Sequence, residues 1–309
     1  MKALWLAHLF SLNCTATLSE FFTIQEAVNS GTSIFDPHLV ELSSAWSDIR
    51  QDSFPMIKKM KFEEFCREIE AALERGIKFS YPGQEDFPKE LLTLNEIPFF
   101  LTYKGTPVWK KSVGFSVVGS REPSADSEAW CEKELSQLLS VLPLYTVSGG
   151  ARGVDQICHR VSVRLGLPTV AFLPSGVEQI YPASLEVLTE AILSSGGALV
   201  SEYLPKTSMK KQFFQRRNRL IAGLGQVCLI IEAKRRSGTL ITALQALEQS
   251  KPLLVLPSHP YDGRALGGLD LLLDGATPVR DAEDLVNFLA AELKGRVRED
   301  RDLVAEPHH

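Results

Sequence analysis

The chain has 309 residues, of which 44% are hydrophobic and 23% are charged. These shares are typical of a soluble globular protein and exclude a disordered, collagen-like or coiled-coil chain. The 33 Lys and Arg residues against 38 Asp and Glu give a formal net charge of −5, which by itself argues against a nucleic-acid partner.

The cysteines and histidines lack the spacing that a metal site or a disulfide framework requires. The five cysteines are odd in number, and no two stand in a C-x-x-C pattern. We therefore expect reduced thiols, no metal and no cofactor. No stretch reaches the roughly 18 apolar residues of a membrane span, and no cleavage site follows the short apolar run at residues 1–10. These features predict a cytoplasmic protein that has no membrane partner.

The first third of the chain shows two patterns. Residues 1–76 are poor in strand signals and carry apolar residues at helical spacing over 62–73, which predicts a small N-terminal helical domain. Residues 77–112 are interrupted by prolines and glycines. They are predicted to form a linker with short strands near 78–81 and 99–103.

From residue 113 to residue 293, short apolar runs alternate with amphipathic helices. Near-continuous hydrophobicity is what a strand buried on both faces of a parallel sheet requires. The runs lie at 114–119, 144–148, 169–173, 198–201, 227–231 and 253–256, and the predicted helices lie at 124–140, 153–165, 184–193, 212–223, 238–249 and 282–291. We therefore predict an α/β domain with a doubly wound, Rossmann-like, mostly parallel sheet. Residues 294–309 are predicted to be a polar tail, too short for another domain.

Four of the predicted strand-to-helix junctions are rich in glycine, serine and arginine. Ligands of open α/β sheets bind at such junctions, because free N–H groups at a helix N-terminus attract anions. The stretches are Val118-Gly119-Ser120-Arg121, Ser148-Gly149-Gly150-Ala151-Arg152-Gly153-Val154-Asp155, residues 213–223 and Ser237-Gly238-Thr239-Leu240. The second stretch has neither the G-x-G-x-x-G spacing nor a P-loop lysine, so dinucleotide binding and phosphoryl transfer lack their usual support. A phosphate cradle and an ordinary tight turn remain open for it.

Basic residues are concentrated between residues 206 and 236. This segment holds nine of them against one acidic residue, Glu232, so it carries +8 and the rest of the chain carries −13. The run Arg216-Arg217-Asn218-Arg219 gains nothing from its like charges unless an anion lies opposite. The segment therefore predicts a site for backbone phosphates. Phe213, Phe214 or Tyr181 could stack on bases there, with core packing as the alternative for the phenylalanines.

These stretches, in this order, resemble the DNA-processing protein A family (DprA, also called Smf). The resemblance covers about residues 87–280. Besides the four junctions it rests on Phe87-Pro88, Leu91-Leu92, Pro98 to Gly105, His159, Tyr181-Pro182, Ser201-Glu202-Tyr203, Glu232-Ala233, Thr242-Ala243 and Asp274-Gly275-Ala276. Each piece is weak alone, but the combination is specific.

The resemblance implies an extended Rossmann-like fold and, at the N-terminus, a small domain similar to SAM or helix-hairpin domains. It also implies a homodimer that binds single-stranded DNA during natural transformation, protects it and loads the RecA recombinase on it. No enzymatic activity is implied. The residues expected to contact phosphate or shape the pocket are Gly119, Ser120, Arg121, Gly149, Gly150, Arg152, Gly153, Arg216, Arg217, Asn218, Arg219, Ser237, Gly238 and Thr239.

The chain departs from the family pattern in several places. Residues 12–17 stand where many members have a glycine-bearing helical hairpin, so a DNA contact there is not expected. Gln215 replaces a frequent proline, Leu185 and Leu269 replace frequent asparagines, and Ser258 follows Pro257 in place of glycine. No winged-helix domain is expected after the last predicted helix.

Two other functions remain as alternatives. The first is a nucleotide-binding or nucleotide-hydrolysing Rossmann enzyme related to nucleoside-monophosphate phosphoribohydrolases, whose motif resembles P-G-G-x-G-T-x-x-E. In this chain the position of the glutamate is occupied by Thr242, which argues against that reaction. The second is a protein-interaction domain, in which acidic partner proteins would occupy the arginine cluster.

Overall fold

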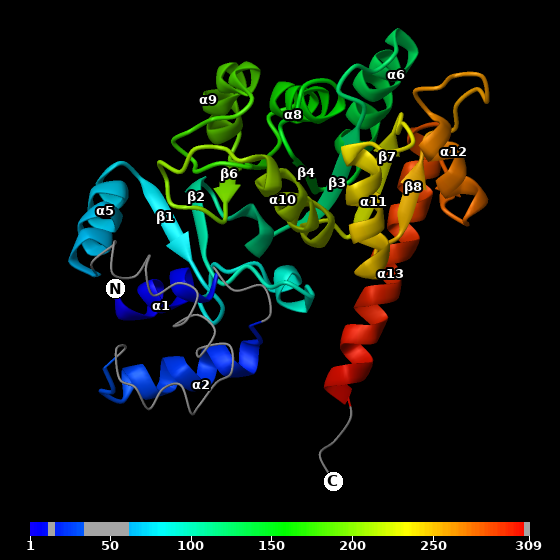
Figure 1. Ribbon diagram of the computed structural model, residues 1–309. Coiled ribbons are helices and arrows are strands. Elements are labelled where there is room, and N and C mark those ends of the chain that lie inside the picture. Colours follow the sequence, from blue (N-terminus) through cyan, green and yellow to red (C-terminus); the bar gives the residue numbers. More distant parts are fainter. Residues whose placement is uncertain (12–15, 34–61, 306–309) are drawn as a thin grey trace.

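The computed structural model describes residues 1–11, 16–33 and 62–305, and nine strands of these residues form one sheet (Figure 1). The spatial order is β1-β2-β6-β5-β4-β3-β7-β8-β9. The strands are β1 (Ile77–Ser80), β2 (Leu101–Gly105), β3 (Val113–Gly119), β4 (Leu144–Ser148), β5 (Thr169–Phe172), β6 (Ala198–Ser201), β7 (Val227–Ile231), β8 (Leu253–Val255) and β9 (Thr277–Pro278). β1 pairs antiparallel with β2 and β2 with β6, whereas all other pairs are parallel.

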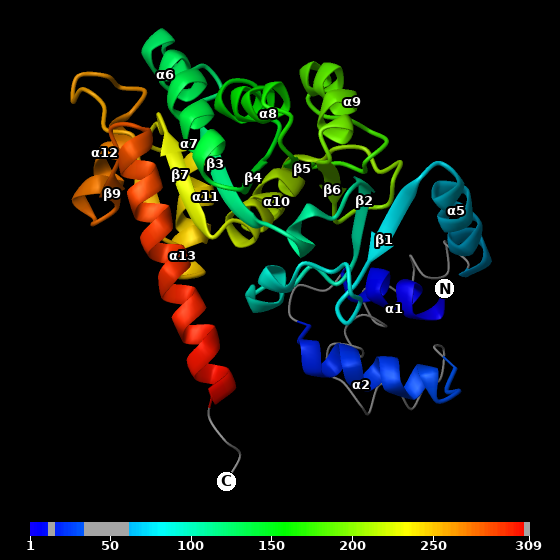
Figure 2. The same cartoon turned by 180° about the vertical axis from the view of Figure 1, so that it is seen from behind.

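Helices cover both faces of the sheet. They are α1 (Lys2–Phe10), α2 (Leu18–Asn29), α5 (Phe62–Glu74), α6 (Ala125–Trp130), α7 (Ser136–Val141), α8 (Val154–Arg164), α9 (Glu186–Ser194), α10 (Lys211–Leu224), α11 (Gly238–Glu248), α12 (Leu266–Leu273) and α13 (Ala282–Ala305). Short helical turns are η1 (Lys89–Thr93), η2 (Val108–Lys110), η3 (Cys131–Leu135) and η4 (Ala183–Leu185). α10 and α11 lie on the near side of the sheet in Figure 1, and α13 lies on the near side in Figure 2.

Each central strand contributes alternate side chains to two cores, because successive side chains of a strand point to opposite faces. Val118 packs with Leu220 of α10 and Ala243 of α11, whereas its neighbour Val117 packs with Ile157 of α8 on the other face. This explains why the strands are mostly apolar on both faces. The predicted fold class, a Rossmann-like and mostly parallel α/β sheet, is confirmed.

The sheet is larger than predicted at both edges. β1 and β2, which we expected within a linker, extend it as antiparallel strands. At the other edge, α12 and β9 were not predicted, because α12 begins Leu-Gly-Gly. Those glycines have a packing reason: the N–H groups of Gly267 and Gly268 both donate to the carbonyl of Ala233, and a Cβ at Gly267 would lie 2.8 Å from that oxygen.

The N-terminal helices share a core with the sheet. The ring of Phe21 in α2 lies 5.3 Å from that of Phe99, and His8 of α1 lies 5.1 Å from Phe100, just before β2. The hydrophobic cluster that holds these phenylalanine rings also includes Ile192 of α9. The predicted domain boundary at residue 76 therefore stays a prediction. The predicted departure at residues 12–17 lies in part outside the described residues.

At the C-terminus the predicted polar tail is largely helical, because α13 continues to Ala305 and projects beyond the sheet (Figure 2). Leu285 and Leu289 anchor its first turns in the core, and the carboxylate of Glu134 accepts the N–H of Ala282 at its start. A nucleated helix propagates at little cost, and no proline interrupts the sequence before residue 307. Within the described residues, no helix is both long enough and apolar enough to cross a membrane.

Stability is expected to fall on acidification because of His8. Its ring is buried between Trp5, Phe65 and Phe100, and burial lowers its pKa to about 4. The unfolded chain, with an ordinary histidine pKa of about 6.5, binds the proton first, so stability is lost as pH falls from 6.5 to 4.

We expect His8→Phe to reduce the loss of unfolding free energy between pH 7 and pH 4 by about 3 kcal/mol, measured by urea unfolding at both values. His159 is buried too, with a pKa lowered to about 3 by burial and by Arg217, and it remains in both proteins as an internal reference. Equal pH dependence in the two proteins would contradict the assignment to His8.

Candidate functional site

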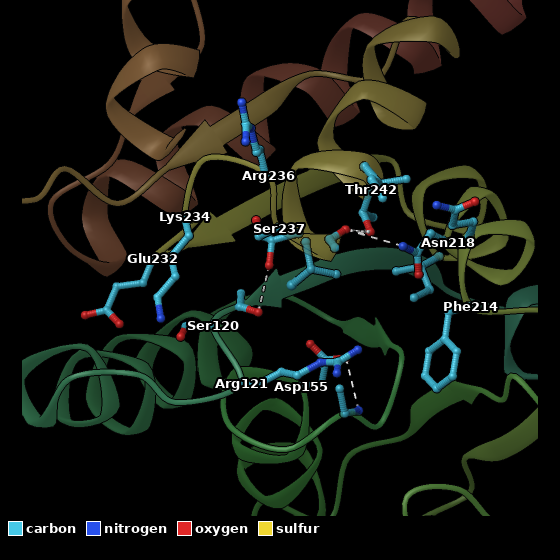
Figure 3. Close-up of a pocket in the computed structure, with 18 of the residues that line it drawn as sticks. Ser120, Arg121, Asp155, Phe214, Asn218, Glu232, Lys234, Arg236, Ser237 and Thr242 are labelled. Carbon is cyan, nitrogen blue, oxygen red and sulfur yellow. Dashed lines mark hydrogen bonds between the residues drawn. The ribbon is translucent and has the colours of Figure 1, made fainter. Parts of the chain in front are cut away.

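A cavity of about 520 Å³ lies at the carboxyl ends of β3 and β7 (Figure 3). These strands are neighbours, but the chain continues from β3 to β4 on one side and from β7 to β8 on the other. Such a switch point leaves a crevice where ligands of open α/β sheets bind. The cavity is lined by the loops after both strands and by α10 and α11.

The loop after β3 approaches the neighbouring backbone closely. The N–H of Ser120 donates to the carbonyl of Ile231 at 3.0 Å, and a Cβ at Gly119 would lie 2.2 Å from that oxygen. The next side chain, Arg121, is exposed, and its guanidinium carbon lies 5.7 Å from the ring centre of Phe214. Tyr181 contacts Phe214 edge-on at 5.6 Å, so a cation and two aromatic rings stand together beside the cavity.

The glycine-rich loop after β4 is organised around two buried charges. The carboxylate of Asp155 accepts the N–H groups of Gly149 and Ala151, each at 3.2 Å. Arg217 donates to the carbonyls of Gly149 at 2.5 Å and of Phe172 at 2.6 Å. Gly153 precedes α8 with a φ of +76°, a conformation that favours glycine. Ala151 and Asp155 line the cavity, whereas the other residues of this loop do not.

Arg217 keeps its charge although it is buried. Burial lowers its pKa to about 10, and the charge of Asp155 opposes that shift. Burial likewise raises the pKa of Asp155, and Arg217 opposes that shift in turn. The two groups therefore stabilise each other's ionised forms beneath the cavity.

The other two arginines of the cluster face away from the cavity. Arg219 is buried and bonds both carboxylate oxygens of Glu202, at 2.6 and 2.5 Å, and also the carbonyl of Glu96. Arg216 donates to the carbonyl of Ser11 at 2.6 Å. Successive residues of a helix are turned by about 100°, so these arginines cannot share one face with Arg217.

The first turn of α11 closes the opposite wall. The side chain of Ser237 caps the helix by accepting the N–H of Leu240, and the hydroxyl of Thr239 donates to the carbonyl of Gly119 at 2.9 Å. Asn218 reaches the same turn by donating to the carbonyl of Gly238. The first N–H groups of a helix have no partner within it, so this turn offers donors for an anion.

Two cations at the rim were not among the predicted site residues. Lys234 and Arg236 are exposed and line the cavity, whereas Arg235 between them is paired with Asp270 at 2.6 Å. The signal was present in the sequence as three consecutive basic residues before Ser237. Sequence alone did not show which of the three would be paired elsewhere.

Three carboxylates line the cavity; Glu122 is exposed, whereas Asp155 and Glu232 are engaged in hydrogen bonds. Glu232 is buried and accepts hydrogen bonds from the N–H and hydroxyl of Ser124 and from the hydroxyl of Ser127. Glu232 thereby anchors the start of α6. Thr242, at the position where the phosphoribohydrolase motif has glutamate, donates to the carbonyl of Gly238. Within the described ranges, no group of His, Cys, Asp and Glu side chains could hold a metal ion.

The predicted site residues thus fall into two groups. Those that line the cavity are Gly119, Ser120, Arg121, Arg217, Asn218, Ser237, Gly238 and Thr239. Those that do not are Gly149, Gly150, Arg152, Gly153, Arg216 and Arg219. Contact of either group with phosphate stays a prediction.

The fold and the cavity define a Rossmann-like α/β protein with a crevice at its switch point that is lined by basic side chains and by the N-terminal turn of α11. The chain belongs to the DNA recombination-mediator protein A family, whose model matches residues 78–290, and the predicted resemblance is confirmed.

Relatives and solved structures extend the comparison. The chain is 31% identical over 246 residues to protein Smf of Escherichia coli, covering 78% of this chain but only 66% of that relative's length. It is similar to the structure of DNA processing protein A from Streptococcus pneumoniae (TM-score 0.71, 25% identity, 90% of this chain and 95% of that one). It is also similar to a Helicobacter pylori DNA processing protein A whose single-stranded DNA binding mode has been described (TM-score 0.62, 28% identity, 70% and 97%).

Replacing Gly119 by alanine is expected to destabilise the site. The new Cβ would lie 2.2 Å from the carbonyl oxygen of Ile231 and 2.6 Å from a methyl group of Val154, so β3 and β7 must separate. We expect a loss of more than about 2 kcal/mol in unfolding free energy, measured by denaturant titration. The control is Gly238→Ala, where no atom lies within 4 Å of the new Cβ, and a change within about 0.5 kcal/mol is expected. Equal effects of the two substitutions would refute the packing argument.

Replacing Arg219 by leucine should remove both short hydrogen bonds of the buried Glu202 carboxylate and leave it only Arg216, whose Nε lies 3.9 Å away. We expect a loss of about 3–5 kcal/mol in unfolding free energy, and adding Glu202→Gln should restore part of it. A double-mutant cycle by urea unfolding measures the coupling. Additive effects would show that the pair is not coupled.

Proposed function

We propose that this protein binds single-stranded DNA in the cavity between β3 and β7. The observation that carries the proposal is the exposed cation set Arg121, Lys234 and Arg236 around the N-terminal turn of α11, in a chain that is negative overall. Cations of this kind recognise backbone phosphates, and the first turn of a helix adds N–H donors for the same oxygens.

The shape of the site favours a single strand. A cavity of about 520 Å³ suits a ligand the size of a nucleotide. A base can enter it only when it is not paired in a duplex. Phe214 and Tyr181 stand beside Arg121 and offer faces on which such bases stack. The description of a single-stranded DNA binding mode for the Helicobacter pylori relative supports the same reading.

The wider role in this proposal follows family membership. It includes protection of incoming single strands during natural transformation, loading of RecA on them, a homodimeric state and a cytoplasmic location. The protein acts by binding, without catalysing a reaction.

The competing function, hydrolysis of nucleotides, is supported by the three carboxylates that line the cavity, those of Glu122, Asp155 and Glu232. It is disfavoured because Glu232 is held by three donors of α6 and its preceding turn, and Asp155 by the N–H groups of Gly149 and Ala151. Release of free base from a panel of nucleotides, abolished by Asp155→Asn, would establish this function instead.

Arg121→Ala is expected to weaken DNA binding by a similar factor for most sequences, because the lost contact is to phosphate. The slope of log K against log salt should fall by about 0.7, the value for one phosphate contact on a single strand. Fluorescence anisotropy of a labelled oligonucleotide at several salt concentrations measures both quantities. Arg280→Ala is the matched control, since Arg280 is exposed and paired with Asp284 at the start of α13. A flat salt response of the unsubstituted protein, or no binding at low salt, would refute the proposal.

A further inference from the structure

A second cavity, of about 570 Å³, adjoins the candidate site. It lies between α10, α11 and residues 94–96, which follow η1. Gln215 of α10 and Ile241 of α11 line both cavities and so form the divide between them. A strand whose phosphates occupy the first cavity therefore has to cross only these two side chains to reach the second.

The two cavities differ in charge. The first is lined by five basic and three acidic residues, whereas the second has two arginines and two glutamates, which cancel. The head group of Arg219 is already bound by Glu202, and Arg216 donates to Ser11. The glutamates Glu96 and Glu248 are exposed, so this cavity offers no net positive charge to a phosphate.

Carboxamides dominate the second cavity. Five line it: Asn95, Gln212, Gln215, Gln245 and Gln249. Gln249 donates to the carbonyl of Arg219, and Gln245 donates to Glu248. In the part of the chain that the structure describes, the side chains of Asn95, Gln212 and Gln215 make no hydrogen bond, and all three are exposed.

A carboxamide presents a donor and an acceptor side by side. The edges of unpaired bases present the same pair, and asparagine and glutamine recognise bases in this way. A neutral cavity with three uncommitted carboxamides, next to a cationic one, has the chemistry of a base site beside a phosphate site.

We propose that the cavity between α10, α11 and residues 94–96 binds an unstacked base of the strand held in the cavity between β3 and β7. The inference rests on the proposed function, since it assumes that a single strand is bound. The base site adds affinity that depends on the base and not on the phosphates. It thereby gives the protein a preference among sequences.

The test compares strands with and without bases. Labelled oligonucleotides of dT, dA, dC and dG, and an abasic strand of equal length, are titrated by fluorescence anisotropy with the full-length protein. The variant Asn95→Ala/Gln212→Ala removes two exposed amides without a described partner, so the fold is expected to be retained. Gln137→Ala, an exposed amide on α7 at the opposite face of the sheet, is the matched control.

We expect the double variant to bind at least one of the base-bearing strands about 3- to 30-fold more weakly, since each lost hydrogen bond costs a small factor. Its affinity for the abasic strand should be unchanged, differences among the four homopolymers should shrink, and Gln137→Ala should behave as the unsubstituted protein. Equal weakening on abasic and base-bearing strands, or no weakening on any strand, would overturn the inference. If the unsubstituted protein binds no strand, the proposed function itself fails; if Arg121→Ala weakens binding and the double variant does not, only the base site fails.

Discussion

The site depends on one buried charge, the guanidinium of Arg217. It donates hydrogen bonds to the carbonyls of Gly149 and Phe172, where β4 and β5 end. Its positive charge also favours the ionised form of Asp155, whose carboxylate accepts two N–H groups of the glycine-rich loop. Removing one member of such a buried set would leave the others without compensation. The loop after β4 therefore takes its form from α10, an element that follows it by more than fifty residues.

Different faces of helix α10 line the cavity, pair with Glu202 and pack in the core. Arg217 and Asn218 face the cavity, Arg219 locks the helix to Glu202, and Leu220 with Ala222 packs in the core. A run of basic residues that looks like one patch in the sequence is thus split by the helical turn into a ligand-facing part and a structural part. The exposed positive charge around the cavity comes instead from loop ends, at Arg121, Lys234 and Arg236.

This division places exposed cations around the cavity although the chain carries a net charge of −5. Basic residues outnumber acidic ones by five to three in the lining of the first cavity, where the N-terminus of α11 adds a partial positive charge. Beside it lies the neutral, amide-lined cavity, separated only by Gln215 and Ile241. Two adjacent environments, one cationic and one neutral, match the two chemically distinct parts of a nucleotide strand.

The sequence by itself determined the parallel sheet, because strands buried on both faces must be mostly apolar, and it predicted ligand contacts at the strand-to-helix junctions that contain Gly119 and Ser237. It also located the basic segment. Only the tertiary structure decided which arginines form ion pairs: Arg219 pairs with Glu202 and Arg235 pairs with Asp270, whereas Arg121 is exposed beside the cavity. The edge strands β1 and β2 and the helix α12 likewise follow from long-range contacts. Local patterns report which side chains prefer burial, whereas the pairing of charges depends on residues that are distant in the sequence and meet only in the folded chain.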